Sequence, residues 1–175
     1  MRWTRWLFLI GVALAVIALD QISKALVAAN LGLYEQWAPV EALRPYFTFT
    51  YVQNTGAAFG ILPDGGLFFA LVAFVVVGMI LYFYRQMPDQ GWPIRLALGL
   101  QLGGATGNLI DRIRLGYVVD FFDFKFWPVF NVADASIVVG VGLLLGVLWW
   151  VERRANDPQP PVPPVEDEPS QIAPH

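Results

Sequence analysis

The residues of this chain that could perform chemistry are carboxylates, amides and basic groups set within or beside apolar stretches. The sequence contains no cysteine, which excludes a thiol nucleophile, a disulfide framework and thiolate metal sites. The only histidine, His175, is the last residue, so neither Ser-His-Asp catalysis nor a histidine-based zinc site is expected. The remaining candidates lie in short polar blocks and are Asp20, Asn54, Asn108, Arg112, Asp120, Asn131 and Asp134.

Aspartates beside apolar residues offer a second kind of chemistry among these candidates. Asp120 follows Val118 and Val119, an apolar approach that would desolvate its carboxyl group. Asp134 stands at the start of the last apolar stretch, where it could also act as a helix N-terminal cap. Two carboxylates in a poorly hydrated site cannot both ionise easily, so one retains a proton. One can then accept a proton from water while the other donates one, which permits peptide hydrolysis without a covalent intermediate.

For the basic candidates, Lys24 and Arg112, the sequence leaves more than one role open. Asp20 and Lys24 are four residues apart on one helical face, so they can form an ion pair. That pair could merely fix packing, or it could brace a site near the end of its helix. Arg112 could bond to an aspartate or to a substrate carbonyl, and the sequence does not choose between them.

The elements that must position these residues are membrane-spanning helices. The chain has 175 residues, of which 57% are hydrophobic and 14% charged, too few polar residues to cover a globule in water. We expect four spans, at about 6–29, 66–85, 92–110 and 134–151. The first could be misread as a cleaved signal peptide, but its apolar character continues far enough to span uncleaved.

Charge bias predicts the orientation of these spans. Six arginines flank one side, against four basic residues spread over two long connections on the other. Both termini are therefore expected in the cytoplasm, which places segments 30–65 and 111–133 outside and gathers the polar candidates at the outer boundary. The net charge of −3 comes from the tail, because residues 1–156 hold 11 basic and 10 acidic groups. The sequence has no stripe of basic residues, so nucleic-acid binding is not expected.

Two outer segments alternate like strands, and the tail resembles neither strand nor helix. Residues 46–53 and 121–127 place aromatic side chains at every second position, where the rings could rest at the lipid headgroups or act only as an anchor. The fold class expected is therefore an all-α membrane protein, a four-helix bundle with a small extracytoplasmic β element. We expect a peptidase domain over 1–154 and a disordered, proline- and acid-rich cytoplasmic tail over 155–175.

At these blocks the sequence resembles the lipoprotein signal peptidases, also called signal peptidase II. The resemblance rests on DQISK (20–24), NTGAAFG (54–60), GGATGNLIDR (103–112), GYVVDFFDF (116–124) and FNVADASIVVG (130–140). It implies that Asp120 and Asp134, out of five candidate aspartates, form a catalytic pair. It implies supporting roles around the site for Asp20, Lys24, Asn54, Gly104, Asn108, Arg112 and Asn131.

The resemblance also implies a substrate and a location. The enzyme would cleave bacterial prolipoproteins just before a diacylglyceryl-modified cysteine, at a site facing the outer leaflet of the cytoplasmic (inner) membrane. Globomycin, a cyclic peptide, would inhibit it, membrane lipid would surround it, and a monomer is expected. No cofactor and no metal is expected.

Three other activities could use some of these residue types. Intramembrane Asp, Asn and Lys also mark ion- or proton-coupled transporters, but here the polar groups gather at one boundary and no internal repeat is evident. A Ser–Lys peptidase would need Ser23 or Ser136 with Lys24, yet Ser23 points about 100° away from Lys24 on a helix. Metal-dependent hydrolysis by clustered aspartates would be revealed by sensitivity to chelators.

Overall fold

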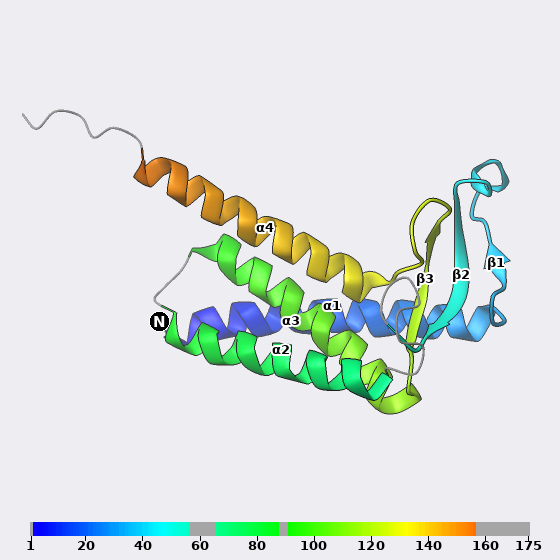
Figure 1. Ribbon diagram of the computed structural model, residues 1–175, viewed down its shortest axis with the longest axis horizontal. Coiled ribbons are helices and arrows are strands. Elements are labelled where there is room, and N and C mark those ends of the chain that lie inside the picture. Colours follow the sequence, from blue (N-terminus) through cyan, green and yellow to red (C-terminus); the bar gives the residue numbers. More distant parts are fainter. Residues whose placement is uncertain (1, 57–65, 88–90, 157–175) are drawn as a thin grey trace, which may run out of the picture.

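The computed structural model describes residues 2–56, 66–87 and 91–156 and consists of long helices with a small sheet at one end (Figure 1). The helices are α1 (Arg2–Asn30), α2 (Gly66–Gln86), α3 (Trp92–Leu115) and α4 (Val132–Ala155). The strands are β1 (Gln36–Trp37), β2 (Phe47–Asn54) and β3 (Val118–Phe124), and a short 3₁₀ turn, η1, covers Glu41–Leu43. Each of the four expected spans is confirmed as a helix. The expected tail lies outside the described residues from 157 onward.

Local sequence explains where the last two long helices begin and end. Pro93 lies in the first turn of α3, where its missing N–H has no helical partner to lose. Gly116 ends that helix with a φ of 81°, a left-handed conformation that glycine adopts without strain. Asn131 caps α4 and forms a reciprocal capping box with Asp134. The N-cap position is thus held by Asn131, and Asp134 takes part in capping as the third residue of the helix.

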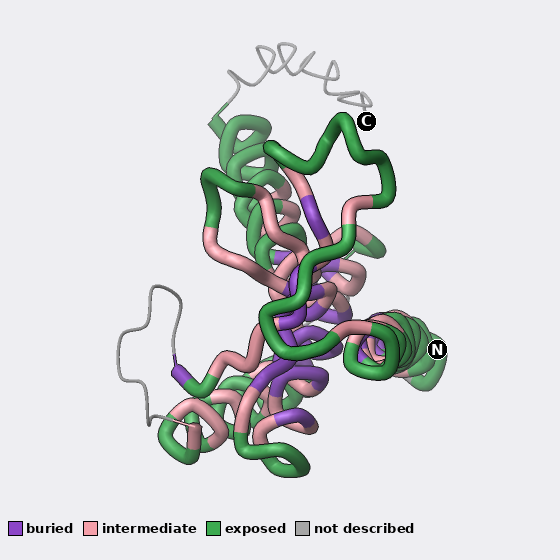
Figure 2. The backbone as a smooth tube through the Cα atoms, turned by 90° about the vertical axis from the view of Figure 1, so that its right-hand side faces the viewer, coloured by how far each residue is buried: buried purple, intermediate pink, exposed green. Residues whose placement is uncertain are grey.

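Helix α3 is the centre of the bundle and differs in composition from its neighbours. It packs against α1, α2 and α4, and Figure 2 shows the buried residues gathered in the middle of the molecule. Among the helices that the structure describes, three are long and apolar enough to cross a membrane: α1 from Trp3, α2 and α4. Helix α3 is not among them, because it is rich in glycine and carries Arg95, Asp111, Arg112 and Arg114. Neighbouring helices cover much of this polar surface.

The sheet has the order β1-β2-β3 and is antiparallel throughout. Strand β2 agrees with the predicted 46–53 to within one residue. The prediction of a strand over 121–127 was wrong in its bounds, because β3 starts at Val118 and ends at Phe124. Pairing with β2 sets this register: Asp120 lies opposite Val52, and a shift between Phe49 and Val52 follows from a bulge. Asp120 is therefore part of a strand rather than of its approach.

A polar cluster fastens the three strands together. The Asp123 carboxylate accepts hydrogen bonds from Thr50 and Thr48, both buried, and from the ammonium group of Lys125. Lys125 also donates to Thr48 and to Gln36 of β1. Burial alone would raise the pKa of Asp123, but these bonds and the Lys125 charge hold it below its usual value. The carboxylate therefore serves the sheet as a charged acceptor.

Candidate active site

Asp120 lies where β3 meets the ends of the helices and is only 2% exposed. The Asn54 side chain donates to its Oδ2 atom at 2.8 Å, and the Asn131 side chain donates to its Oδ1 atom at 2.6 Å. Burial, and then the nearby charge of Asp134, raise the pKa of Asp120 to about 7, although the two amide bonds oppose the shift. The carboxyl group can thus carry a proton at neutral pH.

Asp134 lies in the first turn of α4 and bonds to Asn108 and Asn131. Its Oδ1 atom accepts a hydrogen bond from the Asn108 side chain at 2.7 Å, and its Oδ2 atom accepts one from the backbone N–H of Asn131 at 3.2 Å. The side chain of Asn131 in turn donates to Asn108 at 3.1 Å as well as to Asp120. Asn108 and Asn131 therefore join the two aspartates in one network, with Asp134 half-buried and Asp120 enclosed.

A buried lysine supports this network from α1. The ammonium group of Lys24 lies 2.9 Å from Asp20, 2.8 Å from Asp111 and 3.0 Å from the Asn108 carbonyl oxygen. Asp20 also accepts a hydrogen bond from the backbone N–H of Ala133 at 3.0 Å. The predicted Asp20–Lys24 pair is confirmed, and its contacts join α1 to α3 and to the start of α4. The pair thus lies between the helices and also reaches the Asn108 side chain, which donates to Asp134.

Two members of this support were not anticipated as site residues. Asp111 is 3% exposed, pairs with Lys24 and accepts a bond from the backbone N–H of Val119 at 3.2 Å, which ties α3 to β3. Gln21 donates to Asp111 at 2.8 Å. A signal was present in the sequence, because Asp111 stands one helical turn from Asn108 and shares its face of α3.

Arg112 occupies the border of the network rather than its centre. Its guanidinium lies 5.7 Å from the ring centre of Phe69 on α2 and donates to the Asn108 backbone carbonyl at 3.5 Å. Its charge interacts most strongly with Asp134 and less strongly with Asp120 and Asp111. Its Nε atom is buried and has no hydrogen-bond partner among the described residues.

Gly104 permits the close contact of α3 with α4 at the site. A Cβ atom there would lie 2.4 Å from the backbone carbonyl oxygen of Ala133, the residue before Asp134. Any side chain would push the start of α4 away. Within the described residues, no group of three His, Cys, Asp or Glu side chains could hold a metal ion.

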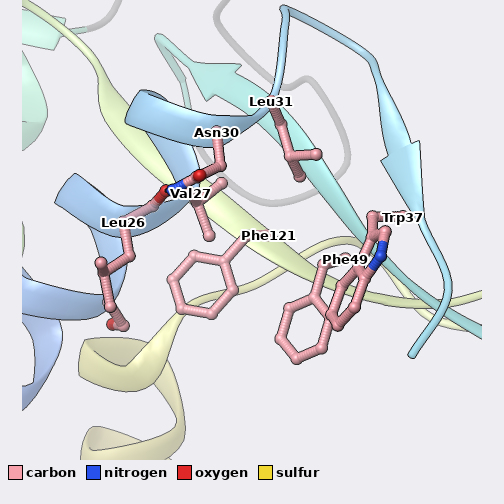
Figure 3. Close-up of a pocket in the computed structure, with 8 residues that line it drawn as sticks. Leu26, Val27, Asn30, Leu31, Trp37, Phe49 and Phe121 are labelled. Atoms are coloured by element: carbon pink, nitrogen blue, oxygen red, sulfur yellow. The ribbon is translucent and has the colours of Figure 1, made fainter.

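An apolar cavity of about 620 Å³ lies beside the network, between the end of α1 and the sheet (Figure 3). Leu26, Val27 and Leu31 line it from the helix, and Trp37, Phe49 and Phe121 line it from the strands. Because successive strand residues point to opposite faces, Phe121 and Asp120 face away from one another. The cavity therefore lies on the other face of β3 from the Asp120 side chain.

Comparison with known proteins decides between an enzyme and a transporter. The family model described as signal peptidase (SPase) II matches residues 12–150. This chain belongs to the signal peptidase II family. The match runs from within α1 to within α4 and includes all the residues of the network.

Individual relatives agree with membership of signal peptidase II. A lipoprotein signal peptidase of Halothermothrix orenii is 47% identical over 142 residues, covering 81% of this chain and 95% of its own. One from Symbiobacterium thermophilum is 45% identical, covering 85% of this chain and 99% of its own.

Solved structures agree as well. One, described as a bacterial membrane enzyme determined by the in meso method, has a TM-score of 0.76 at 28% identity and covers 88% of this chain and 93% of its own. A second of the same description has a TM-score of 0.71 at 31% identity, covering 80% and 91%. The chain is thus a membrane-embedded, multi-pass aspartic peptidase, and the transporter alternative is not supported.

Proposed function

We propose that this chain removes the signal peptide from diacylglyceryl-modified bacterial prolipoproteins by cutting the peptide bond just before the lipidated cysteine. The observation that carries the proposal is the joining of Asp120 and Asp134 through Asn108 and Asn131 at one end of the bundle. The names of the relatives, lipoprotein signal peptidase, support the substrate class.

The two aspartates would divide the proton transfers between them. Asp120, with its pKa raised to about 7, enters the reaction protonated, and Asp134 enters as the carboxylate. Asp134 takes a proton from a water molecule, whose oxygen attacks the carbonyl carbon before the cysteine, while Asp120 donates its proton to the carbonyl oxygen. When the tetrahedral intermediate collapses, Asp120 recovers that proton, and Asp134 delivers its own to the leaving amine. No covalent enzyme intermediate forms.

The surrounding residues would fix this division of labour. Asn54 and Asn131 hold both oxygens of Asp120, so its carboxyl group cannot rotate away from the substrate. Lys24 donates to the Asn108 carbonyl oxygen, which leaves the Asn108 amide free to donate to Asp134. Arg112, through its unpaired Nε atom, would hold a substrate carbonyl near the scissile bond.

The membrane arrangement forms part of the proposal. All four helices would cross the bacterial inner membrane, α3 being shielded from lipid by its neighbours, with both termini in the cytoplasm and the site at the outer leaflet. The substrate's apolar helix would then enter sideways from the bilayer. Residues 1–154 would form the peptidase domain, acting as a monomer that globomycin-type cyclic peptides inhibit, and 155–175 a cytoplasmic tail.

The direct test uses single substitutions and a purified diacylated prolipoprotein in detergent micelles. Asp120→Asn and Asp134→Asn are each expected to lower kcat by at least about 100-fold, the range that general acid or base catalysis contributes. Asp123→Asn is the matched control, because Asp123 lies on the same strand but bonds only within the sheet. Substantial turnover by either dyad variant would reject the assignment, and a wild-type protein that leaves this substrate intact would reject the function.

A further inference from the structure

Gln101 is a half-buried polar side chain of α3, about two helical turns before Asn108. The Nε2 atom of Gln101 is buried and has no hydrogen-bond partner among the described residues. In a bilayer no water is present to satisfy such a donor, so leaving it unpaired is costly. A helix that needed only packing at this position could use leucine. The unpaired amide donor is therefore suited to a partner that the described residues do not supply.

Gln101 lies between two neighbours of α3. A Cβ atom added to Gly140 of α4 would meet the Gln101 Cγ atom at 2.9 Å, so that glycine leaves room for the glutamine side chain. On its other side, Gln101 lines an apolar groove of about 240 Å³ with Val76, Met79 and Ile80 of α2. In Figure 1, α3 likewise runs between α2 and α4. The Gln101 side chain thus borders the groove between α2 and α3 and packs against α4 on its other side.

The same face of α3 leads from Gln101 to the aspartates. Gln101, Ala105, Asn108 and Arg112 fall within about 60° of arc at 3.6 residues per turn. Ala105, which lies between Gln101 and Asn108 on this face, is small and buried. The Arg112 guanidinium lies over the Phe69 ring of α2 and interacts with the charge of Asp134 on α4. Arg112 therefore lies between the same two helices at the sheet end. Gln101 and Asn108 therefore stand on one face of α3, the first beside the groove and the second in the active site.

The spacing between Gln101 and Asn108 along α3 suits a helical peptide that becomes extended shortly before the bond that is cut. Gln101 precedes Asn108, the partner of Asp134, by seven residues, or about 10 Å of helix. A peptide must be extended where it is cut, and about three extended residues cover 10 Å. A substrate helix lying parallel to α3 would thus end level with Gln101. Its last four backbone carbonyls would have no partner within that helix.

We infer that Gln101 is a substrate-positioning residue, whose side-chain amide donates to the free carbonyls at the end of the signal peptide's apolar helix. The inference rests on the proposed function, since it names how that substrate is held. An uncharged amide suits this task, because it satisfies a carbonyl in the bilayer without introducing a buried charge. The contact sets how many residues separate the helix end from the scissile bond.

The test replaces Gln101 by methionine, which keeps the length of the side chain but removes the donor. We expect kcat/KM for a diacylated prolipoprotein to fall roughly five- to tenfold, because one hydrogen bond contributes about 1 kcal/mol and 1.4 kcal/mol corresponds to tenfold. The midpoint of thermal unfolding should stay equal or rise, because the variant no longer buries an unpaired donor. Leu14→Met, on the exposed face of α1, is the matched control and should change neither value.

A second measurement examines the spacing itself. A substrate with one residue inserted between its apolar helix and the cleavage site should be cut several-fold more slowly than the parent by the wild type. Gln101→Met should lose most of this discrimination, since paired changes at interacting groups are not additive. An unchanged kcat/KM, a fall in both activity and unfolding temperature, or preserved discrimination would each overturn the inference. Failure of the proposed function itself is separate, since it would appear as a wild type that cleaves neither substrate.

Discussion

Replacing Asp120 by asparagine is expected to abolish cleavage and, at the same time, to stabilise the folded protein above neutral pH. The pKa of Asp120 is raised from 3.8 to about 7 by burial and then by Asp134. Between these two values the folded state holds a proton that the unfolded state has released. Stability therefore falls as the pH rises through this window, and the wild type is destabilised above it.

The size of the effect follows from the same shift. A difference of about three pKa units corresponds to about 4 kcal/mol, an upper figure for a carboxyl group coupled to its neighbour. Asparagine carries no ionisable group, but it offers one acceptor oxygen where Asp120 accepts from both Asn54 and Asn131. Losing one of those bonds in a buried site costs about 1–3 kcal/mol. A net stabilisation of about 1–3 kcal/mol is expected at pH 8 and almost none at pH 5.

Thermal unfolding in detergent micelles at several pH values measures this effect. The wild-type midpoint should decline between about pH 4 and pH 7, and the Asp120→Asn midpoint should decline much less. Asp123→Asn, whose parent carboxyl group has a lowered pKa, is the control and should not show a gain at pH 8. If Asp120→Asn unfolds with the same pH dependence as the wild type, the raised pKa of Asp120 and the reasoning from it are wrong.

Three further predictions follow from the network and from the helix contacts. The kcat/KM of the wild type should fall above about pH 7, because Asp120 then loses the proton it must donate; a profile flat to pH 9 would contradict this. Lys24→Met should lower the free energy of unfolding by about 3–5 kcal/mol, because it leaves Asp20 and Asp111 buried without their partner. Lys125→Met is the control: it removes a more exposed ion pair and should cost at most about 1 kcal/mol. Gly104→Ala should cost about 1–3 kcal/mol and impair cleavage, because its Cβ meets the Ala133 carbonyl at 2.4 Å; Gly142→Ala, with nothing within 4 Å, should be neutral in both assays.

Several features of the fold were predictable because they depend on neighbours in the chain. The apolar lengths of α1, α2 and α4 follow from composition, and the start of α4 follows from Asn131 and Asp134 three residues apart. The Asp20–Lys24 pair likewise needs only one turn of helix. Recognition of the aspartate pair and its asparagines depended on the five ordered blocks rather than on periodicity.

Features that depend on pairing between distant segments were not predictable. Alternating aromatic residues suggested a strand over 121–127, but hydrogen bonding to β2 moved it to Val118–Phe124. Strand β1 has two residues, too few to show a period, and exists because Gln36 and Trp37 pair with β2. The length of α3 was recognised, yet its shielding among the other helices and the burial of Gln101 are consequences of packing.

By itself, then, the sequence determined an apolar, multi-helix membrane protein of the signal peptidase II type and the residue types available for its chemistry. Only the tertiary structure decided how those residues act on one another. The sequence alone does not name the partners of Asp111. The approach of α1 to α3 brings Lys24 and Gln21 to its carboxylate. The raised pKa of Asp120 likewise depends on exclusion of water and on Asp134, which begins a different helix. Desolvation and the interaction of charges depend on distances in space, and the order of residues along a chain does not contain those distances.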